Sequence, residues 1–290
     1  MISRLPVTSA RTLAEAYALL KLQPPGLKVL AGGTDLMVQL NARVGLERIG
    51  HVLDIWRLAE LRFITREDGR LSLGALATYT DLMRSPLVRE ACPALADVSR
   101  EVGAWAIQNR GTLGGNVCNA SPAGDTLPLL LAAGARFHLG GPRGDRAVEA
   151  DGFFVAYRKT ALGADELLLR VEVPAMDPAR GERIIYRKVG TRRAQSTSKV
   201  LLAVRATVEG ERLLSVRIAA GSVAPIPLRC RTAEAAVEGQ ALDEGVIARA
   251  RAALDGDIRP ITDVRSTAGY RRKVCGNLLE RLLRELVERK

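Results

Sequence analysis

A glycine-containing segment, residues 112–128, carries the residues best suited to chemistry. It reads Thr-Leu-Gly-Gly-Asn-Val-Cys-Asn-Ala-Ser-Pro-Ala-Gly-Asp-Thr-Leu-Pro. Gly114 and Gly115 have no side chain to keep a ligand from the backbone, and both can adopt a positive φ. Asp125 stands where the N-cap of a following apolar helix is expected. The hydrogen-bonding side chains around the glycines are Thr112, Asn116, Asn119 and Ser121.

A second glycine turn follows an apolar run near the N-terminus. Its residues are Val29, Leu30, Ala31, Gly32, Gly33, Thr34, Asp35 and Leu36. Neither turn has the G-x-G-x-x-G spacing of a dinucleotide fingerprint or the lysine of a P-loop. Two such turns can aim backbone N–H groups at one anion. The alternative, which the residues alone leave open, is a pair of ordinary turns that lead into core helices.

The first 55 residues predict a strand–helix–strand–helix–strand unit that positions the first turn. Thr12 to Glu15 form a capping-box pattern that opens a helix through about Leu22. Residues 27–31 and 51–55 have the composition of buried strands. The first six residues contain no apolar segment of a secretory signal.

Residues 56–176 predict a second region around the longer glycine segment. Two hairpins are expected, one around Asp68-Gly69 and one around residues 141–144, and a strand is expected over residues 166–174. The segment 174–181 is polar and contains Pro178, so we place a domain boundary there. Residues 177–290 then predict one antiparallel sheet and a last helix capped by Ser266, with Val274 and Leu278 on its apolar face. The fold class is α+β.

The composition narrows the classes of function. The net charge is +11, but the basic residues do not cluster with aromatic ones, and only 4% of residues are aromatic. We therefore expect a dispersed basic surface that fits acidic partner subunits, and no nucleic-acid binding. No apolar run approaches about 18 residues, so we expect no membrane span and a cytoplasmic protein. The four cysteines lack zinc or iron–sulfur spacing and are expected to be packing residues, Cys118 included.

The two glycine turns together resemble those of the FAD-binding, or medium, subunits of the molybdenum hydroxylases, the xanthine dehydrogenase family that includes CO dehydrogenase. The resemblance covers nearly the whole chain. It implies an FAD-binding domain of the vanillyl-alcohol-oxidase (PCMH) type at residues 1–176, with subdomains of about 1–55 and 56–176. It also implies a small α+β domain at residues 177–290, similar to the CO dehydrogenase flavoprotein C-terminal domain.

The resemblance also implies roles for individual residues. The FAD pyrophosphate is expected between residues 29–36 and residues Thr112, Leu113, Gly114, Gly115 and Asn116. Asp125 is expected to bind ribityl or ribose hydroxyls, although a pure helix cap remains open. Leu168 is expected near the flavin ring, although it is equally compatible with a core position. Lys188 is expected near the electron-rich end of the reduced flavin, the alternative being a solvated strand lysine.

The implied function is that of an FAD-carrying electron-transfer subunit in a molybdenum hydroxylase complex. Electrons would arrive from [2Fe-2S] clusters of a small partner subunit and leave to NAD⁺ or another acceptor. A molybdopterin large subunit would oxidise the substrate, with a purine such as xanthine favoured, in a dimer of heterotrimers. We expect no catalytic acid–base set and no metal site in this chain. Residues 194–198 differ from the acidic segment of many relatives, which leaves the electron acceptor open.

Two other functions are compatible with the sequence. One is a self-sufficient FAD-dependent oxidoreductase of the same fold, although the small C-terminal region offers little room for a substrate-binding cap. The other is a basic binding protein without enzymatic function, whose glycine turns have no ligand. Substrate turnover by the isolated chain would favour the first, and salt-sensitive nucleic-acid binding without flavin would favour the second.

Overall fold

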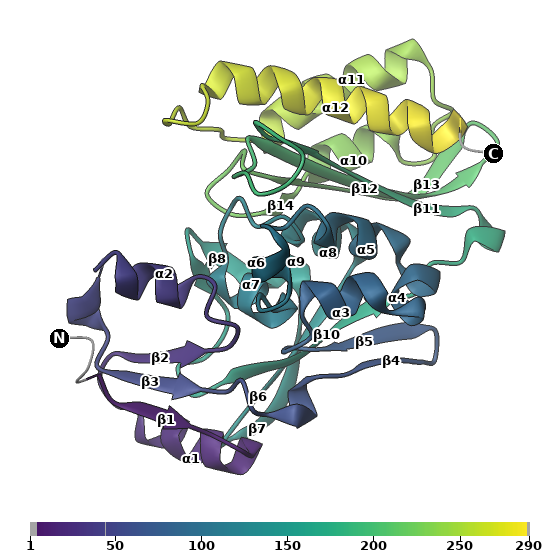
Figure 1. The fold of residues 1–290 in the computed structure, drawn as a ribbon. Coiled ribbons are helices and arrows are strands. Elements are labelled where there is room, and N and C mark those ends of the chain that lie inside the picture. Colours follow the sequence, from purple (N-terminus) through teal and green to yellow (C-terminus); the bar gives the residue numbers. More distant parts are fainter. Residues whose placement is uncertain (1–4, 44, 289–290) are drawn as a thin grey trace.

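The structure, a computed structural model, describes residues 5–43 and 45–288. Residues 1–4, part of the segment used to judge a secretory signal, lie outside the described residues. Three units follow one another along the chain: an N-terminal unit (residues 5–55), a middle unit (56–176) and a C-terminal unit (177–288) (Figure 1).

The N-terminal unit is a three-stranded parallel sheet in the order β1-β3-β2. Its elements are β1 (Val7–Ser9), α1 (Leu13–Leu22), β2 (Leu27–Leu30), α2 (Leu36–Asn41) and β3 (His51–Asp54). Thr12 caps α1 as predicted, because its side chain accepts the backbone N–H of Glu15. The first glycine turn joins the carboxyl end of β2 to α2, so the sheet fixes where the turn lies.

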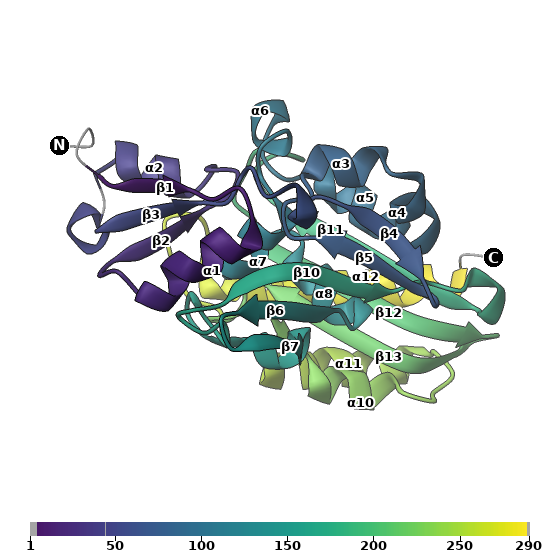
Figure 2. The same ribbon diagram turned by 90° about the horizontal axis from the view of Figure 1, so that it is seen from below.

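The middle unit is a five-stranded antiparallel sheet in the order β4-β5-β10-β6-β7, covered on one face by short helices (Figures 1 and 2). Both predicted hairpins form, at β4–β5 and β6–β7. Its strands are β4 (Ile64–Glu67), β5 (Arg70–Gly74), β6 (Arg136–Gly141), β7 (Gly144–Glu149), β8 (Phe154–Ala156), β9 (Lys159–Thr160) and β10 (Leu167–Pro174). Its helices are α3 (Tyr79–Arg84), α4 (Pro86–Ala91), α5 (Pro93–Ser99), α6 (Trp105–Gln108), α7 (Leu113–Asn119), α8 (Leu127–Ala133) and α9 (Ala150–Phe153).

The C-terminal unit is an antiparallel sheet in the order β11-β12-β13-β14 with helices on its outer face. Its elements are β11 (Glu182–Val189), β12 (Val200–Glu209), β13 (Arg212–Gly221), β14 (Leu228–Arg229), α10 (Arg231–Val237), α11 (Glu244–Asp257) and α12 (Ala268–Glu288). The predicted Ser266 cap of α12 is wrong. The hydroxyl of Thr267 accepts the Tyr270 N–H, while the Ser266 N–H bonds to Asp263.

The sheet of the C-terminal unit is covered on both faces. Side chains such as Tyr186 and Leu201 face the core of the middle unit, whereas Ile185 and Leu202 face α10–α12. Helix α8 packs on β12 and β13 and is buried along its whole length. A helix covered on all sides is apolar all round, which explains the sequence Leu-Pro-Leu-Leu-Leu-Ala-Ala.

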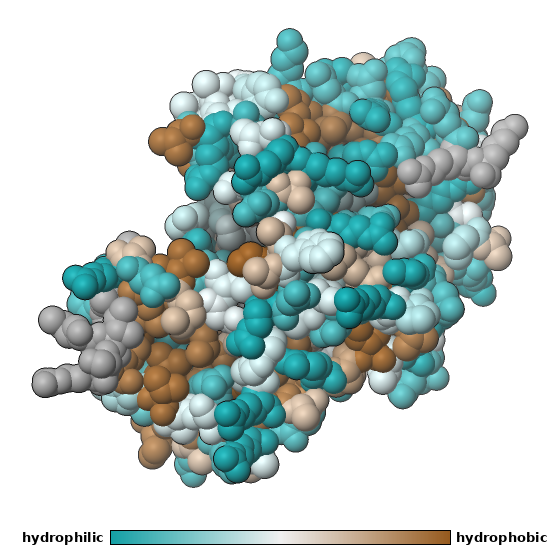
Figure 3. Space-filling model, in the orientation of Figure 1, coloured by the Kyte–Doolittle hydropathy of each residue, from teal (hydrophilic) through white to brown (hydrophobic). Residues whose placement is uncertain are grey.

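The surface view in Figure 3 shows a recess between the lobe of the C-terminal helices and the lobe of the N-terminal unit. Hydrophilic residues cover most of that face, with apolar patches scattered among them. None of the helices in the described segments combines the length and apolar character needed to cross a membrane.

Candidate functional site

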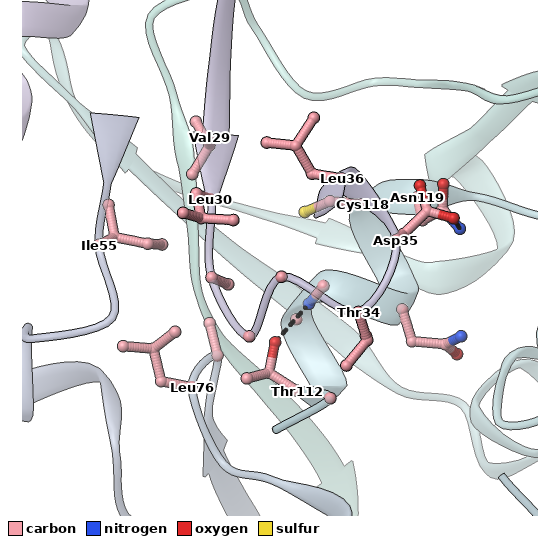
Figure 4. Close-up of a pocket in the computed structure, with 18 of the residues that line it drawn as sticks. Val29, Leu30, Thr34, Asp35, Leu36, Ile55, Leu76, Thr112, Cys118 and Asn119 are labelled. Atoms are coloured by element: carbon pink, nitrogen blue, oxygen red, sulfur yellow. Dashed lines mark hydrogen bonds between the residues drawn. The ribbon is translucent and has the colours of Figure 1, made fainter. Parts of the chain in front are cut away.

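A cavity of about 470 Å³ lies where the N-terminal unit meets α7 and β10 (Figure 4). Both glycine turns line it, although about 80 residues separate them in the sequence. The predicted site residues that line the cavity are Val29, Leu30, Ala31, Gly32, Gly33, Thr34, Asp35, Leu36, Thr112, Gly114, Gly115, Asn116 and Leu168. Leu113, Asp125 and Lys188 do not line it.

The first turn offers unused backbone donors to the cavity. The N–H groups of Gly32, Gly33, Thr34 and Asp35 donate to no acceptor within residues 5–43 and 45–288. Gly33 has a φ of +80°, a conformation that glycine adopts without strain. A Cβ on Gly32 would lie 1.7 Å from the Arg110 carbonyl oxygen, so only glycine fits there. Consecutive N–H groups of this kind form an anion-binding concavity.

The second turn is the N-terminus of α7. Thr112 caps the helix, and its hydroxyl accepts the Gly115 N–H at 3.0 Å. The N–H groups of Leu113 and Gly114 donate to Ala77 and Ala75 of the segment between β5 and α3. The fully buried Leu113 therefore anchors the helix rather than facing the cavity. Gly114 is required because a Cβ there would lie 2.6 Å from the Ala75 carbonyl oxygen.

Side chains tie the two turns together at the cavity edge. The Asn119 amide, at the end of α7, donates to the Asp35 carboxylate at 3.4 Å, and Figure 4 shows these two side chains facing each other. Arg158, between β8 and β9, donates to the Asn119 side-chain oxygen at 3.2 Å. Arg158 could not be found from the sequence, because its pairing with Asn119 depends on the β8–β9 connection reaching α7.

Apolar side chains from separate elements form another wall of the cavity. They include Leu168 of β10, which lines the cavity and is 3% exposed, as its alternative core position requires. Its place beside a flavin ring stays a prediction. The other members are Leu30, Ile55, Leu76, Val102, Ile107 and Leu162, with the ring of Tyr79. Apart from Leu30, sequence reasoning missed these residues, because scattered apolar residues carry no motif. Such a wall suits a flat apolar ring system.

Asp125 and Lys188 form a buried ion pair beside this site. Lys188 Nζ lies 2.7 Å from Asp125 Oδ2 and also donates to the Glu101 carbonyl oxygen at 3.0 Å. The predicted helix cap is wrong, because Thr126 holds the N-cap position of α8 and Asp125 turns towards β11. The solvated alternative for Lys188 is also wrong, since its side chain is 2% exposed. Burial raises the pKa of the Asp125 carboxyl, and the Lys188 ammonium opposes that rise.

Cys118 corrects another expectation. Its side chain is exposed to the cavity, whereas Cys92, Cys230 and Cys275 are buried. Surrounding protein raises the pKa of the Cys118 thiol to about 12, which keeps it protonated at neutral pH. Cys118 therefore lines the site as a neutral group instead of filling the core.

The donor set fits FAD. Free backbone N–H groups and two glycine turns suit a pyrophosphate, and the apolar wall suits an isoalloxazine ring. The two glycine turns form a backbone cradle for this group. A Cβ at Gly32 or Gly114 would clash with the carbonyl oxygen of Arg110 or Ala75, so the cradle requires glycine at both positions.

Comparisons with known proteins agree with this geometry. The family described as the FAD binding domain in molybdopterin dehydrogenase matches residues 3–176, and the CO dehydrogenase flavoprotein C-terminal domain matches residues 185–286. The carbon monoxide dehydrogenase medium chain of Hydrogenophaga pseudoflava is 32% identical over 273 residues, 94% of this chain and 93% of that one. The xanthine dehydrogenase FAD-binding subunit of Escherichia coli O157:H7 is 31% identical over 279 residues, 96% of this chain and 94% of that one.

A solved structure shows the same fold. Carbon monoxide dehydrogenase from Hydrogenophaga pseudoflava, in a form lacking the Mo-pyranopterin moiety of its molybdenum cofactor, contains a chain that superimposes with a TM-score of 0.91. The sequences are 32% identical, and the match covers 96% of this chain and 95% of that one. The chain therefore belongs to the family of FAD-binding medium subunits of the molybdopterin dehydrogenases, which are oxidoreductases.

Proposed function

We propose that this chain carries FAD and uses it to pass electrons from an iron–sulfur partner to NAD⁺ or another acceptor. The observation that supports this most directly is the row of free N–H groups at Gly32 to Asp35, in a cavity that the N-terminus of α7 also lines. When bound, FAD supplies the redox chemistry by taking up electrons and releasing them as hydride. The chain's own residues bind the cofactor, orient it and exclude water from one side.

Each wall of the cavity has its own part in this proposal. The first turn and the N-terminus of α7 hold the pyrophosphate through backbone hydrogen bonds, without side-chain cations. Leu168 and the rest of the apolar wall contact the ring system. Asp125 and Lys188 do not line the cavity, so we propose that this buried pair acts on the bound cofactor indirectly, through neighbouring residues that do line it. We also propose that residues 1–176 and 177–290 are the two domains, a division that the two matched families support.

The partners follow from the same proposal. A small subunit with [2Fe-2S] clusters delivers the electrons, and a large subunit with molybdopterin oxidises the substrate, together forming a cytoplasmic dimer of heterotrimers. NAD⁺ or another acceptor takes the electrons from the flavin. A purine such as xanthine is the proposed substrate class. It is tested by anaerobic bleaching of the flavin in the assembled complex after purine is added, with carbon monoxide and an aldehyde as competing candidates.

The deciding experiment is an absorption spectrum of the purified full chain, with chromatography of the cofactor released by heat. We expect a flavin spectrum and FAD at one per chain, either as purified or after FAD is added. A chain that is colourless and also fails to bind added FAD would contradict the proposal. Substrate turnover by the isolated chain would instead favour a self-sufficient oxidoreductase.

A further inference from the structure

The C-terminal unit holds the segment that follows the second glycine turn. The Ser222 N–H donates to the Pro122 carbonyl oxygen at 2.8 Å. Arg205 of β12 donates to the Ala133 carbonyl oxygen at the end of α8 at 2.7 Å. Between these contacts, Asp125 is bonded by residues of the same unit, so residues 122–133 are fixed from outside the FAD-binding part of the chain.

Ser198 is a partner of Asp125 that the sequence did not reveal. Its hydroxyl donates to Asp125 Oδ1 at 2.6 Å, while Lys188 occupies Oδ2 at 2.7 Å. Ser198 is 1% exposed and does not line the cavity. The C-terminal unit therefore engages both carboxylate oxygens with donors, and the carboxylate is held in one orientation.

This held carboxylate is linked to the cavity through its neighbour in the chain. Thr126 follows Asp125, and the Thr126 hydroxyl donates to the Asn116 side-chain oxygen at 2.6 Å. Asn116 lines the cavity on the first turn of α7. The bonds that hold Asp125 therefore also hold the backbone from which Thr126 reaches Asn116, a side chain that lines the cavity.

We propose that Ser198 is a positioning residue of the FAD site, whose hydroxyl fixes Asp125 and thereby sets the affinity for FAD without touching the cofactor. The inference rests on the proposed function and adds a residue from the C-terminal unit to the site. If the binding-competent orientation of Asp125 is populated only in part, the apparent dissociation constant rises by the inverse of that fraction.

The ionisable groups around Asp125 give the proposal a pH signature. They are Lys188 and Tyr186 of β11, Tyr79 of α3, and Glu101 after α5, with Arg193 lying 3.8 Å from Glu101. The bond from Ser198 lowers the pKa of Asp125. Without that bond, protonation of Asp125 begins at a higher pH, and the acid-side loss of FAD affinity moves to a higher pH with it.

The test measures FAD affinity of the full chain by flavin fluorescence across the acid-to-neutral range, for Ser198→Ala, Ser198→Thr and Ser196→Ala. Ser196 is the matched control, because its hydroxyl bonds within the same loop to the Arg192 carbonyl oxygen. We expect about tenfold weaker binding for Ser198→Ala at neutral pH, the loss of one bond to a charged group. The loss of FAD affinity at low pH should begin at a higher pH in Ser198→Ala than in the wild type. Ser198→Thr should recover affinity, and Ser196→Ala should match the wild type.

Two outcomes for Ser198→Ala overturn the inference while leaving the proposed function intact. One is wild-type affinity for Ser198→Ala. The other is an equal loss at every pH, which would indicate general destabilisation. An Asp125→Asn chain should not lose FAD affinity as the pH falls through this range. A loss that persists in this variant would also overturn the inference. A wild-type chain that binds no FAD contradicts the proposed function itself.

Discussion

Substituting Gly32 by alanine tests the contact that brings the two glycine turns together. The new Cβ would lie 1.7 Å from the Arg110 carbonyl oxygen, whereas real Cβ contacts are not shorter than 3.0 Å. The difference, 3.0 − 1.7 Å, requires the two backbones to separate by about 1.3 Å. Neither partner is a side chain that can rotate away, so the movement must occur in the turns themselves.

The size of this movement sets the expected effect on FAD binding. Arg110 lies two residues before the Thr112 cap of α7, so its displacement moves the second turn away from the first. A hydrogen bond of about 2.9 Å stretched by about 1.3 Å is broken. Loss of one bond to a charged group costs about 1.5–3 kcal/mol, so we expect FAD to bind at least about tenfold more weakly. Overpacking also destabilises the fold by about 1–3 kcal/mol.

The assay combines FAD titration with thermal unfolding of the full chain. Gly256→Ala in α11 is the matched control, because a Cβ there meets no atom within 4 Å. Replacing a helical glycine by alanine is expected to stabilise the control by about 0.5–1 kcal/mol. Wild-type FAD affinity in Gly32→Ala, with an unchanged unfolding temperature, would refute the close approach of the two turns and the site built on it.

Three further predictions concern the cavity walls. Thr112→Ala should lower the free energy of unfolding by about 1 kcal/mol through loss of the cap on the Gly115 N–H, as measured in urea, whereas Thr112→Ser should retain it. Hydrogen bonds from Arg146 lower the pKa of Glu166, so this pair stabilises the fold above the ordinary glutamate pKa and stops doing so as pH falls through the lowered value. Arg146→Gln should therefore cost about 1 kcal/mol or less at neutral pH and less in acid, where only the bond from Arg146 to the Ala161 carbonyl oxygen is lost; an equal cost at both would contradict the assignment. Cys118 should be alkylated slowly at neutral pH, ahead of the buried cysteines, and bound FAD should block the reaction, as followed by mass spectrometry; labelling unaffected by FAD would place the cofactor elsewhere.

Features that depend on neighbours in the chain were predictable from the sequence. The Thr12 cap and the turn at Asp68-Gly69 each act over a few residues, and both occur as predicted. The two glycine turns were also identified, because each is a contiguous motif whose backbone demands can be read from residue types. The resemblance then assigned the turns to one cofactor, and the cavity brings them together.

Features that depend on packing between distant segments came only from the tertiary structure. Asp125 has the sequence position of a helix cap, but a lysine 63 residues away forms an ion pair with it. Lys188 alternates on a strand like a surface residue, yet the strand is covered on both faces, so the lysine is buried.

The apolar wall of the cavity also could not be predicted from the sequence. Ile55 and Leu76 have no motif, because any core would bury them equally well, and only the sheet order decides that they face a cavity. The sequence of this protein thus determined the backbone cradle, since glycine turns are local. Tertiary structure alone decided which side chains surround the cradle and which residues hold them, because burial and charge pairing arise between segments far apart in the chain.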